Sequence, residues 1–106
     1  MLKKVKRRYL ALKIESCETP RSNEFMETIW ETISRLYGEY GASQTSLSLI
    51  NFDDKNNSAI LRTGHTTVDV VRTALASITR IKDKPAAVYV LAVSGTIKAL
   101  HKSLRQ

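Results

Sequence analysis

The chain has 106 residues, which is long enough for one compact domain and too short for two ordinary ones. Its apolar fraction of 42% and charged fraction of 25% are typical of a globular soluble protein. No stretch approaches the roughly 18 uncharged apolar residues that a membrane span requires. A single cysteine, Cys17, excludes an internal disulfide. We therefore expect one cytoplasmic domain over residues 1–106, with no membrane partner.

The net charge of +7 is unevenly distributed along the chain. Residues 1–8 carry five cations and no acid, residues 9–54 carry three cations against eight acids, and residues 55–106 carry nine cations against two acids. Such asymmetry gives a protein one surface suited to a polyanion. RNA or DNA is the default polyanion for a small cytosolic protein, and an anionic membrane surface is the weaker alternative.

The first half of the chain predicts a strand followed by a helix. Residues 8–16 alternate between apolar and polar side chains, with Leu10, Leu12 and Ile14 on the buried side of a strand. Ser22 is a candidate N-cap for the helix that follows, and Gly38 and Gly41 are expected to end it. The apolar positions of this helix are Phe25, Ile29, Ile33, Leu36 and Tyr40.

The second half predicts a hairpin, a helix, a strand and a terminal helix. Residues 45–52 and 58–63 are expected to be strands joined by the turn at 53–57. Thr66 and Asp69 approximate a capping box for the second helix, whose buried stripe includes Val71 and Leu75. After a polar loop at 82–85, residues 87–93 predict a central strand, and the terminal helix is expected to start at Thr96.

The order of these elements predicts the fold class. Strand, helix, strand, strand, helix and strand form the βαββαβ arrangement of the ferredoxin-like fold, which RNA-recognition motifs share. We expect an α+β sandwich, with helices packed on one face of an antiparallel sheet and an additional C-terminal helix.

Catalytic chemistry is not expected from this chain. Its two histidines, His65 and His101, have no acidic or cysteine neighbours at metal-ligand spacing. The segment Ser94-Gly95-Thr96 does not have the pattern of a nucleophile elbow. We therefore predict no catalytic residue, no metal ligand and no cofactor.

Phosphate contacts are the expected form of nucleic-acid binding. The strands at 8–14 and 58–64 carry one aromatic residue, Tyr9, so they lack the aromatic platform on which RNA-recognition modules stack bases. Residues 1–7 are expected to form a basic mobile arm. The candidate phosphate ligands are Lys3, Lys4, Lys6, Arg7, Arg8, Arg62, Lys98, Lys102 and Arg105.

Two further features allow more than one interpretation. At residues 94–96, Ser94 or Thr96 could cap the terminal helix and Gly95 could allow a sharp reversal, or the helix start could contact a phosphate. Glu27 and Glu31 lie on an acidic helix face that could receive a protein partner or remain solvated.

Three segments carry a resemblance to a known family: KRRYLALKIE, ILRTGHTTVDVVRTALASITRI and YVLAVSGTIKALHK. They resemble the ribonuclease P protein component 2 family, the small protein subunit of archaeal ribonuclease P, which has a eukaryotic counterpart also found in ribonuclease MRP. The resemblance covers nearly the whole chain, and its most specific pieces are RRYL, LRT and VSGTIK.

The resemblance implies a non-catalytic subunit of the ribonucleoprotein that removes the 5′ leader from precursor tRNA. In that enzyme the RNA holds the active site and its magnesium ions. The implied partners are ribonuclease P RNA, precursor tRNA, a larger barrel-like ribonuclease P protein and a second copy of the chain. A generic RNA-binding protein of ribosomal type and a ferredoxin-like ligand-binding regulatory domain remain as alternatives.

Overall fold

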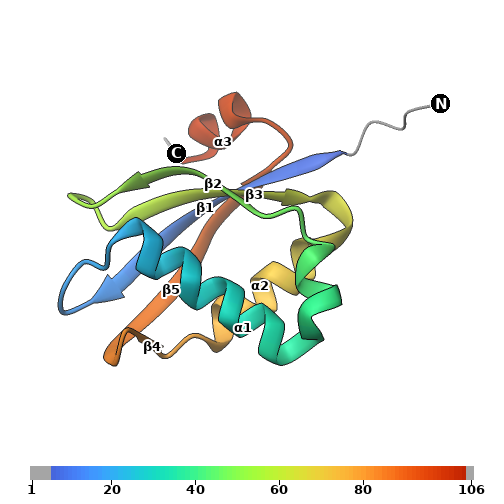
Figure 1. The fold of residues 1–106 in the computed structure, drawn as a ribbon. Helices are drawn as coiled ribbons and strands as arrows, with labels where there is room; N and C mark the ends of the chain where they lie inside the picture. The colour runs from blue at the N-terminus through green and yellow to red at the C-terminus, as the bar shows by residue number, and fades with distance from the viewer. Residues whose placement is uncertain (1–5, 105–106) are drawn as a thin grey trace.

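The computed structural model describes residues 6–104, except for the side chains at positions 40, 43 and 103. The elements are β1 (Arg7–Ser16), α1 (Ser22–Ser43), β2 (Ser48–Asp53), β3 (Ser58–Gly64), a 3-10 turn (His65–Thr67), α2 (Val68–Ser77), β4 (Arg80–Ile81), β5 (Lys84–Ser94) and α3 (Ile97–Leu104). The strand order is β2-β3-β1-β5-β4, and every neighbouring pair is antiparallel. Helices α1 and α2 cover one face of the sheet and α3 covers the other (Figure 1). The predicted ferredoxin-like class is confirmed, with β4 as an addition.

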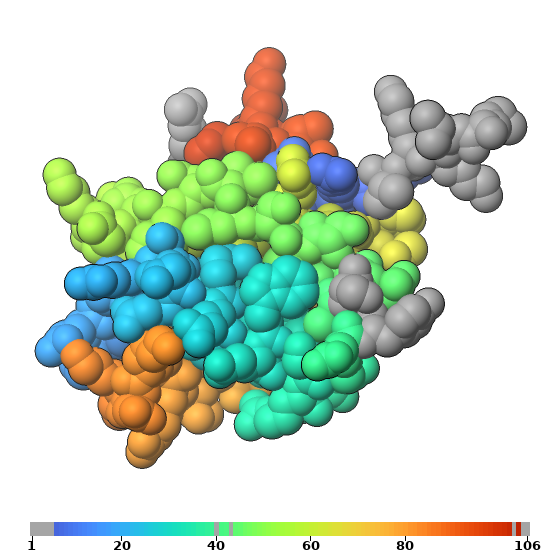
Figure 2. Space-filling model, in the orientation of Figure 1, coloured from blue at the N-terminus to red at the C-terminus, as the bar shows by residue number. Residues whose placement is uncertain are grey.

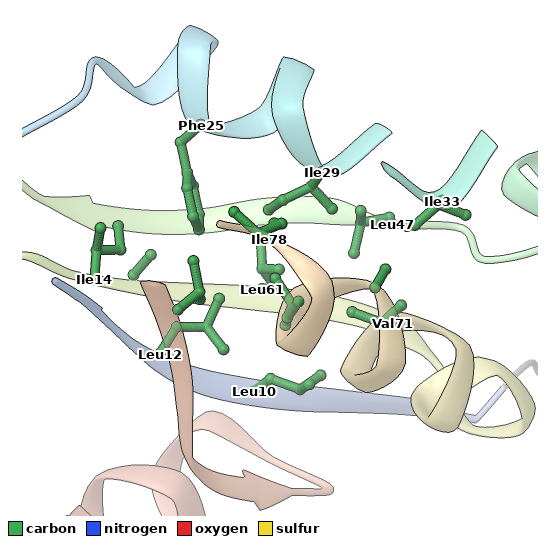
Figure 3. Packing of buried hydrophobic residues seen from close by; sticks show 14 of the residues in the cluster. Leu10, Leu12, Ile14, Phe25, Ile29, Ile33, Leu47, Leu61, Val71 and Ile78 are labelled. Atoms are coloured by element: carbon green, nitrogen blue, oxygen red, sulfur yellow. The ribbon is translucent and has the colours of Figure 1, made fainter. Parts of the chain in front are cut away.

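The main core lies between the sheet and the pair α1 and α2 (Figure 3). The alternation in β1 places Leu10, Leu12 and Ile14 in this core, as predicted, and each is at most 1% exposed. The helical spacing in α1 and α2 brings Phe25, Ile29, Ile33, Val71 and Leu75 against them. Burial of these large side chains is the main source of stability.

Helix α1 begins at Ser22, so its N-cap lies one residue before the predicted cap, and the helix continues beyond its predicted end. Arg21 is its N-cap, because the Phe25 N–H donates to the Arg21 carbonyl at 2.9 Å and the Glu24 carboxylate accepts the Arg21 N–H at 3.0 Å. Gly38 has a φ of 80°, which interrupts the helix in a kink before it resumes. Leu36, one of the apolar positions at helical spacing, lies just before this kink and is 45% exposed.

The capping box predicted at Thr66 and Asp69 does not form. A 3-10 turn precedes α2, Thr67 occupies the N-cap position, and no side chain caps the first amides of α2. The hydroxyl of Thr67 instead donates to the Gly64 carbonyl at 3.0 Å. The 3-10 turn therefore connects β3 to α2, and the first turn of α2 has no side-chain cap.

Strand β2 begins at Ser48, three residues later than predicted. Thr45 lies in the preceding turn, where its N–H and hydroxyl donate to the Ala42 carbonyl at 3.2 and 2.8 Å. The first residues of the expected strand therefore close the end of α1.

The predicted polar loop at 82–85 is a two-residue hairpin. Lys82 and Asp83 have φ angles of 50° and 66°, and positive φ at both positions matches a type I′ turn. The turn joins β4 to a longer β5, with Ile81 paired to Lys84. Ile81 is 3% exposed and fixes the hairpin to the core.

Candidate nucleic-acid interface

Helix α3 is held by a cap at its start and a buried leucine at its centre. The Ala99 N–H donates to the Thr96 hydroxyl at 3.1 Å, which confirms Thr96 as the N-cap. Leu100 is fully buried against Ala11 and Ile60, in a second core on the opposite side of the sheet. This contact fixes the position of the α3 cations relative to the sheet.

The turn before α3 differs from one expectation. Gly95 does not have positive φ; among the described glycines, only Gly38 does. A side chain at Gly95 would meet the Arg8 guanidinium at 3.6 Å, an ordinary van der Waals distance. The backbone at position 95 therefore does not require glycine. The side chain that lies near Gly95 is that of Arg8.

The start of β1 lies beside the start of α3. Tyr9 pairs with Ser94 across β1 and β5, and this register brings Arg8 to the turn at 94–96. The backbone before β1 is also tied down, since the His65 N–H donates to the Lys6 carbonyl at 2.9 Å. Figure 2 shows the blue start of the chain next to the orange-red α3. The pairing of distant strands creates this proximity, and no local sequence signal predicts it.

The start of β1 and helix α3, which meet at the turn before α3, carry part of the predicted set of phosphate ligands. Arg7 is the first residue of β1, Lys98 and Lys102 are exposed on α3, and none of the three has a salt bridge among the described residues. The other predicted ligands at the chain ends, Lys3, Lys4 and Arg105, lie outside the described residues. We call Lys6, Arg7, Arg8, Lys98 and Lys102 the cationic end.

Arg62 lies on β3, paired with Tyr9 and on the α3 side of the sheet. Its side chain is half-buried, and its Nε is buried without a hydrogen-bond partner in the described part of the chain. A shielded guanidinium N–H without an acceptor is unfavourable by itself. Arg62 therefore lies on the same side of the sheet as α3 and its lysines, and its Nε–H has no acceptor among the described residues.

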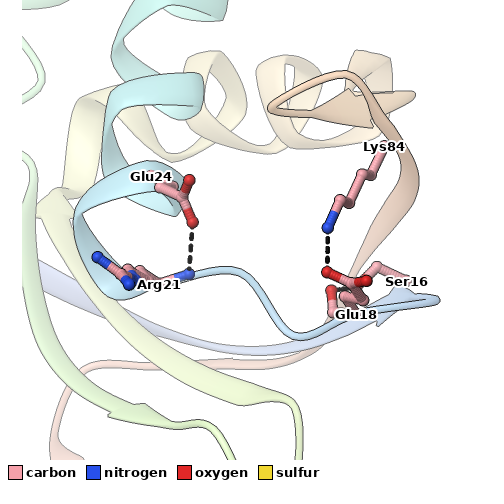
Figure 4. A network of polar contacts seen from close by, with 5 residues as sticks. All are labelled: Ser16, Glu18, Arg21, Glu24 and Lys84. Carbon is pink, nitrogen blue, oxygen red and sulfur yellow. Dashed lines mark hydrogen bonds and ion pairs between the residues drawn. The ribbon is translucent and has the colours of Figure 1, made fainter.

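Two acids, one on α1 and one in the loop before it, are paired with the β4–β5 hairpin. Lys84 forms an ion pair with Glu18, and Lys82 lies 3.3 Å from Glu27 (Figure 4 shows the first pair). The hydrogen bond that Lys84 donates to the Glu18 carboxylate raises the pKa of Lys84. Glu27, a predicted partner contact, is thus engaged within the chain, whereas Glu31 is exposed in a polar groove beside Arg80. The two hairpin lysines are therefore neutralised locally.

Helix α3 covers part of the sheet face on which RNA-recognition modules stack bases. Ala11, Ile60 and Ala92 lie beneath Leu100, with Tyr9 and Ile50 at the margin of this contact. Tyr9 is half-buried there. Over this contact the exposed surface is therefore that of α3, which carries lysines rather than aromatic residues.

Together these features define a small ferredoxin-like α+β domain with a cationic end and a separately paired acidic end. Among residues 6–104, no helix is long and apolar enough to cross a membrane. Within the same residues, no three His, Cys, Asp or Glu side chains gather in a way that could hold a metal ion.

The sequence matches the Rpp14/Pop5 family over residues 8–105, and the chain belongs to this family. It is 34% identical over 95 residues to the Ribonuclease P protein component 2 of Methanosarcina mazei, with 90% of this chain and 80% of that relative covered. The protein of the same name from Pyrococcus furiosus is 35% identical over 97 residues, with coverage of 92% and 81%. These matches confirm the family that the sequence segments indicated.

A solved structure supports the fold independently. A chain in the cryo-EM structure of yeast Ribonuclease MRP superimposes with a TM-score of 0.73, covering 99% of this chain and 93% of that one. Its sequence identity is 16%, so this likeness concerns the fold alone.

Proposed function

We propose that this chain is a protein subunit of ribonuclease P that binds the catalytic RNA and assists removal of the 5′ leader from precursor tRNA. Family membership and the shared name of its relatives support the assignment. The structural observation that carries the RNA-binding part is the cationic end, where the start of β1 reaches the turn before α3 and none of its cations has a salt bridge among the described residues.

The cationic end would act on RNA phosphates. Arg8 offers charge at the junction of β1 and α3, Lys98 and Lys102 offer it along α3, and Lys3, Lys4 and Arg105 extend this set in the sequence. A phosphate near the turn at 94–96 would be held by side chains of Arg8 and Lys98, since the Thr96 hydroxyl already caps α3. Such contacts release counterions and therefore weaken steeply as salt rises.

Arg62 is proposed as a second type of RNA contact. The Arg62 side chain would turn its shielded Nε–H, which has no partner within the described residues, toward an acceptor oxygen of RNA. The bond would be charge-assisted and directional, whereas the exposed lysines act as point charges.

The chain itself would not perform the hydrolysis. Cleavage of a phosphodiester is assisted by metal ions that stabilise the attacking and leaving oxygens, and we assign the magnesium ions to the RNA. The protein would lower the repulsion between phosphates, so that the RNA folds and binds precursor tRNA at less magnesium. A larger barrel-like ribonuclease P protein and a second copy of the chain are proposed as further partners in the cytoplasm.

Reconstituted cleavage of precursor tRNA at limiting magnesium tests this function. The assay contains ribonuclease P RNA and the other protein subunits, with or without this chain. We expect the chain to lower the magnesium concentration that half-maximal cleavage requires. The triple variant Arg8→Ala/Lys98→Ala/Lys102→Ala should lose most of this effect.

A matched triple variant separates position from net charge. Lys55→Ala/Arg72→Ala/Arg80→Ala removes the same charge from exposed positions outside the cationic end, and it should retain the wild-type effect. An unchanged magnesium requirement on adding the wild-type chain would contradict the proposed function. Binding to RNA without that change would favour a generic RNA-binding protein.

A further inference from the structure

The outer edge of β5 is only partly covered. Strand β4 pairs with it at Pro85 and Lys84, and the Ala86 N–H donates to the Thr79 carbonyl at 3.0 Å. Beyond Ala86, the described chain places no strand along this edge. Residues 87–94 therefore pair with β1 on one side and leave the other side open.

The direction of the backbone groups on this edge follows from two hydrogen bonds. The N–H groups of alternate residues point to the same side of a strand. The Ala86 N–H points away from β1, toward Thr79, so the N–H groups of Val88 and Val90 also point away from β1. On β1, the Ile14 N–H donates to the Asn57 carbonyl at 2.7 Å, so it points toward β3 and away from β5. Ile14 is paired with Val88, and in such an antiparallel pair the Val88 N–H points away from β1 as well. Both observations leave the Val88 and Val90 amides on the open edge.

A groove of about 600 Å³ runs beside this edge. Ala76, Ile78 and Thr79, at the end of α2, line one side, and residues 85–89 of β5 line the other. The exposed lining is mainly apolar, and Glu15 is its one charged residue. An edge strand beside the end of a helix is a geometry in which an extended segment can add to a sheet.

The chemistry of the edge selects a protein occupant over RNA. Residues 86–93 carry no charge, and two of their large apolar side chains are well exposed, Tyr89 at 49% and Leu91 at 53%. Phosphates would meet a carboxylate in this groove and no cation. Long uncharged edges promote strand pairing, and this one lacks the lysines that usually block it. The bulge between Val90 and Ala92 limits the regular part to residues 86–90.

We propose that the β5 edge groove, formed by residues 76–79 and 85–90, receives an extended, uncharged and mainly apolar segment of another protein subunit of the assembly. The segment adds a strand to the sheet through the Val88 and Val90 backbone and packs against Tyr89. This proposal rests on the proposed function, because it takes the partner from the ribonuclease P particle.

Amide hydrogen exchange at Val88 and Val90 tests the occupant directly. Exchange is measured for the chain alone at several concentrations, with ribonuclease P RNA, and with the RNA plus the other protein subunits. We expect protection of both amides only in the last sample. Protection that grows with the concentration of the free chain would assign the edge to a second copy, and protection by RNA alone would assign it to RNA; either result overturns the proposal.

A charge on the edge tests the surface. Tyr89→Lys should weaken incorporation of the chain in the presence of the protein subunits about tenfold, without changing its affinity for RNA alone. Leu36→Lys is the matched control, since Leu36 is 45% exposed and lies on α1, away from the groove. Exchange of the Leu61 amide in β3 verifies that both variants are folded. Equal losses in the two variants contradict the assignment to the β5 edge.

The same samples distinguish a failure of the proposed function from a failure of the docking site. A chain that does not enter the particle contradicts the proposed function and this docking site with it. A chain that enters the particle while Val88 and Val90 exchange as fast as in the free chain contradicts the docking site alone.

Discussion

Thr63 and Thr45 are two buried polar residues that join three segments of the chain. The Thr63 hydroxyl donates to the Thr45 carbonyl at 2.6 Å and lies 2.9 Å from the Thr67 hydroxyl. The Gly64 N–H donates to the same Thr45 carbonyl at 3.0 Å. The turn before β2 and the 3-10 turn before α2 are thus fixed to each other through one carbonyl oxygen.

Thr63→Val should destabilise the protein. Valine keeps the shape of the side chain but removes its hydroxyl, so Thr67 loses a partner and the buried Thr45 carbonyl loses one of its donors. We expect about 1–2 kcal/mol less free energy of unfolding, measured by urea denaturation. Thr73→Val, at an exposed position of α2, is the matched control and should change stability by less than about 0.5 kcal/mol. A neutral Thr63→Val variant would contradict the importance of this bond.

The turn between β2 and β3 predicts a shifted titration. The Asn56 side chain donates to the Asp53 carboxylate at 2.7 Å, and the backbone N–H groups of Asn56 and Lys55 donate to it as well. These bonds hold the pKa of Asp53 below its ordinary value of 3.8, with the Asn56 side chain as the largest cause. Because the folded pKa is depressed, the stabilisation is present above the unfolded pKa and is lost as pH falls through the folded one.

Asn56→Ala should therefore raise the pKa of Asp53 toward its ordinary value. The measurement is an NMR titration of the Asp53 carboxyl carbon. Asn51→Ala, an exposed change elsewhere on β2, serves as the control and should leave the titration unchanged. If the titration of Asp53 were the same in Asn56→Ala and the wild type, the side-chain bond would not be the main cause.

At the scale of elements, the sequence predicted those whose pattern is local. Alternation identified β1 through Leu10, Leu12 and Ile14, and helical spacing identified the buried side of α2. Strand β4 escaped detection because it has two residues, and its turn uses Lys82-Asp83 rather than the usual asparagine-glycine or aspartate-glycine pair. A two-residue strand is defined by its partner rather than by its own periodicity.

The candidate site divides in the same way. Thr96, Lys98 and Lys102 could be predicted because capping and helical spacing act within a few residues. The approach of Arg8 to Gly95 depends on the register of β1 and β5, which is set by pairs of residues 70 to 85 positions apart. The ion pair between Glu27 and Lys82, which engages a predicted partner contact within the chain, likewise depends on tertiary structure.

Helix α3 depends on a single anchor, and this predicts a large effect at Leu100. An isolated helix of eight residues is not stable in water, so α3 requires its contact with the sheet. Leu100→Ala should cost about 2–4 kcal/mol and increase amide exchange in α3. Leu104→Ala is the control, since Leu104 is 42% exposed, and it should cost less than about 1 kcal/mol. Equal costs would show that Leu100 is not the anchor.

At the scale of the whole molecule, the net charge of +7 understates the separation of charge. Lys82 and Lys84 are paired with Glu27 and Glu18 at the hairpin end. The cationic end has no such compensation within the described residues. A polyanion approaching the protein would therefore be attracted to one end, and the orientation of the chain on RNA would follow from this field.

The salt dependence of RNA affinity measures how many phosphates this end contacts. Each contact contributes about 0.7 to 0.9 to the slope of log affinity against log salt, depending on whether the RNA is single-stranded or helical. The triple variant Arg8→Ala/Lys98→Ala/Lys102→Ala should therefore flatten the slope by about 2–3. The slope is measured by fluorescence anisotropy with ribonuclease P RNA between low and moderate salt.

The control is the triple variant Lys55→Ala/Arg72→Ala/Arg80→Ala, which lowers the net charge equally. Long-range attraction alone would weaken the RNA affinity of both variants similarly at low salt. At about 0.01 M salt the Debye length is about 30 Å, so charges on distant parts of a small protein act on RNA alike. Direct phosphate contact instead requires the slope to change in the first variant and stay at the wild-type value in the second. Equal flattening in the two variants would mean that RNA is attracted by the total charge and that the junction of β1 and α3 has no special role.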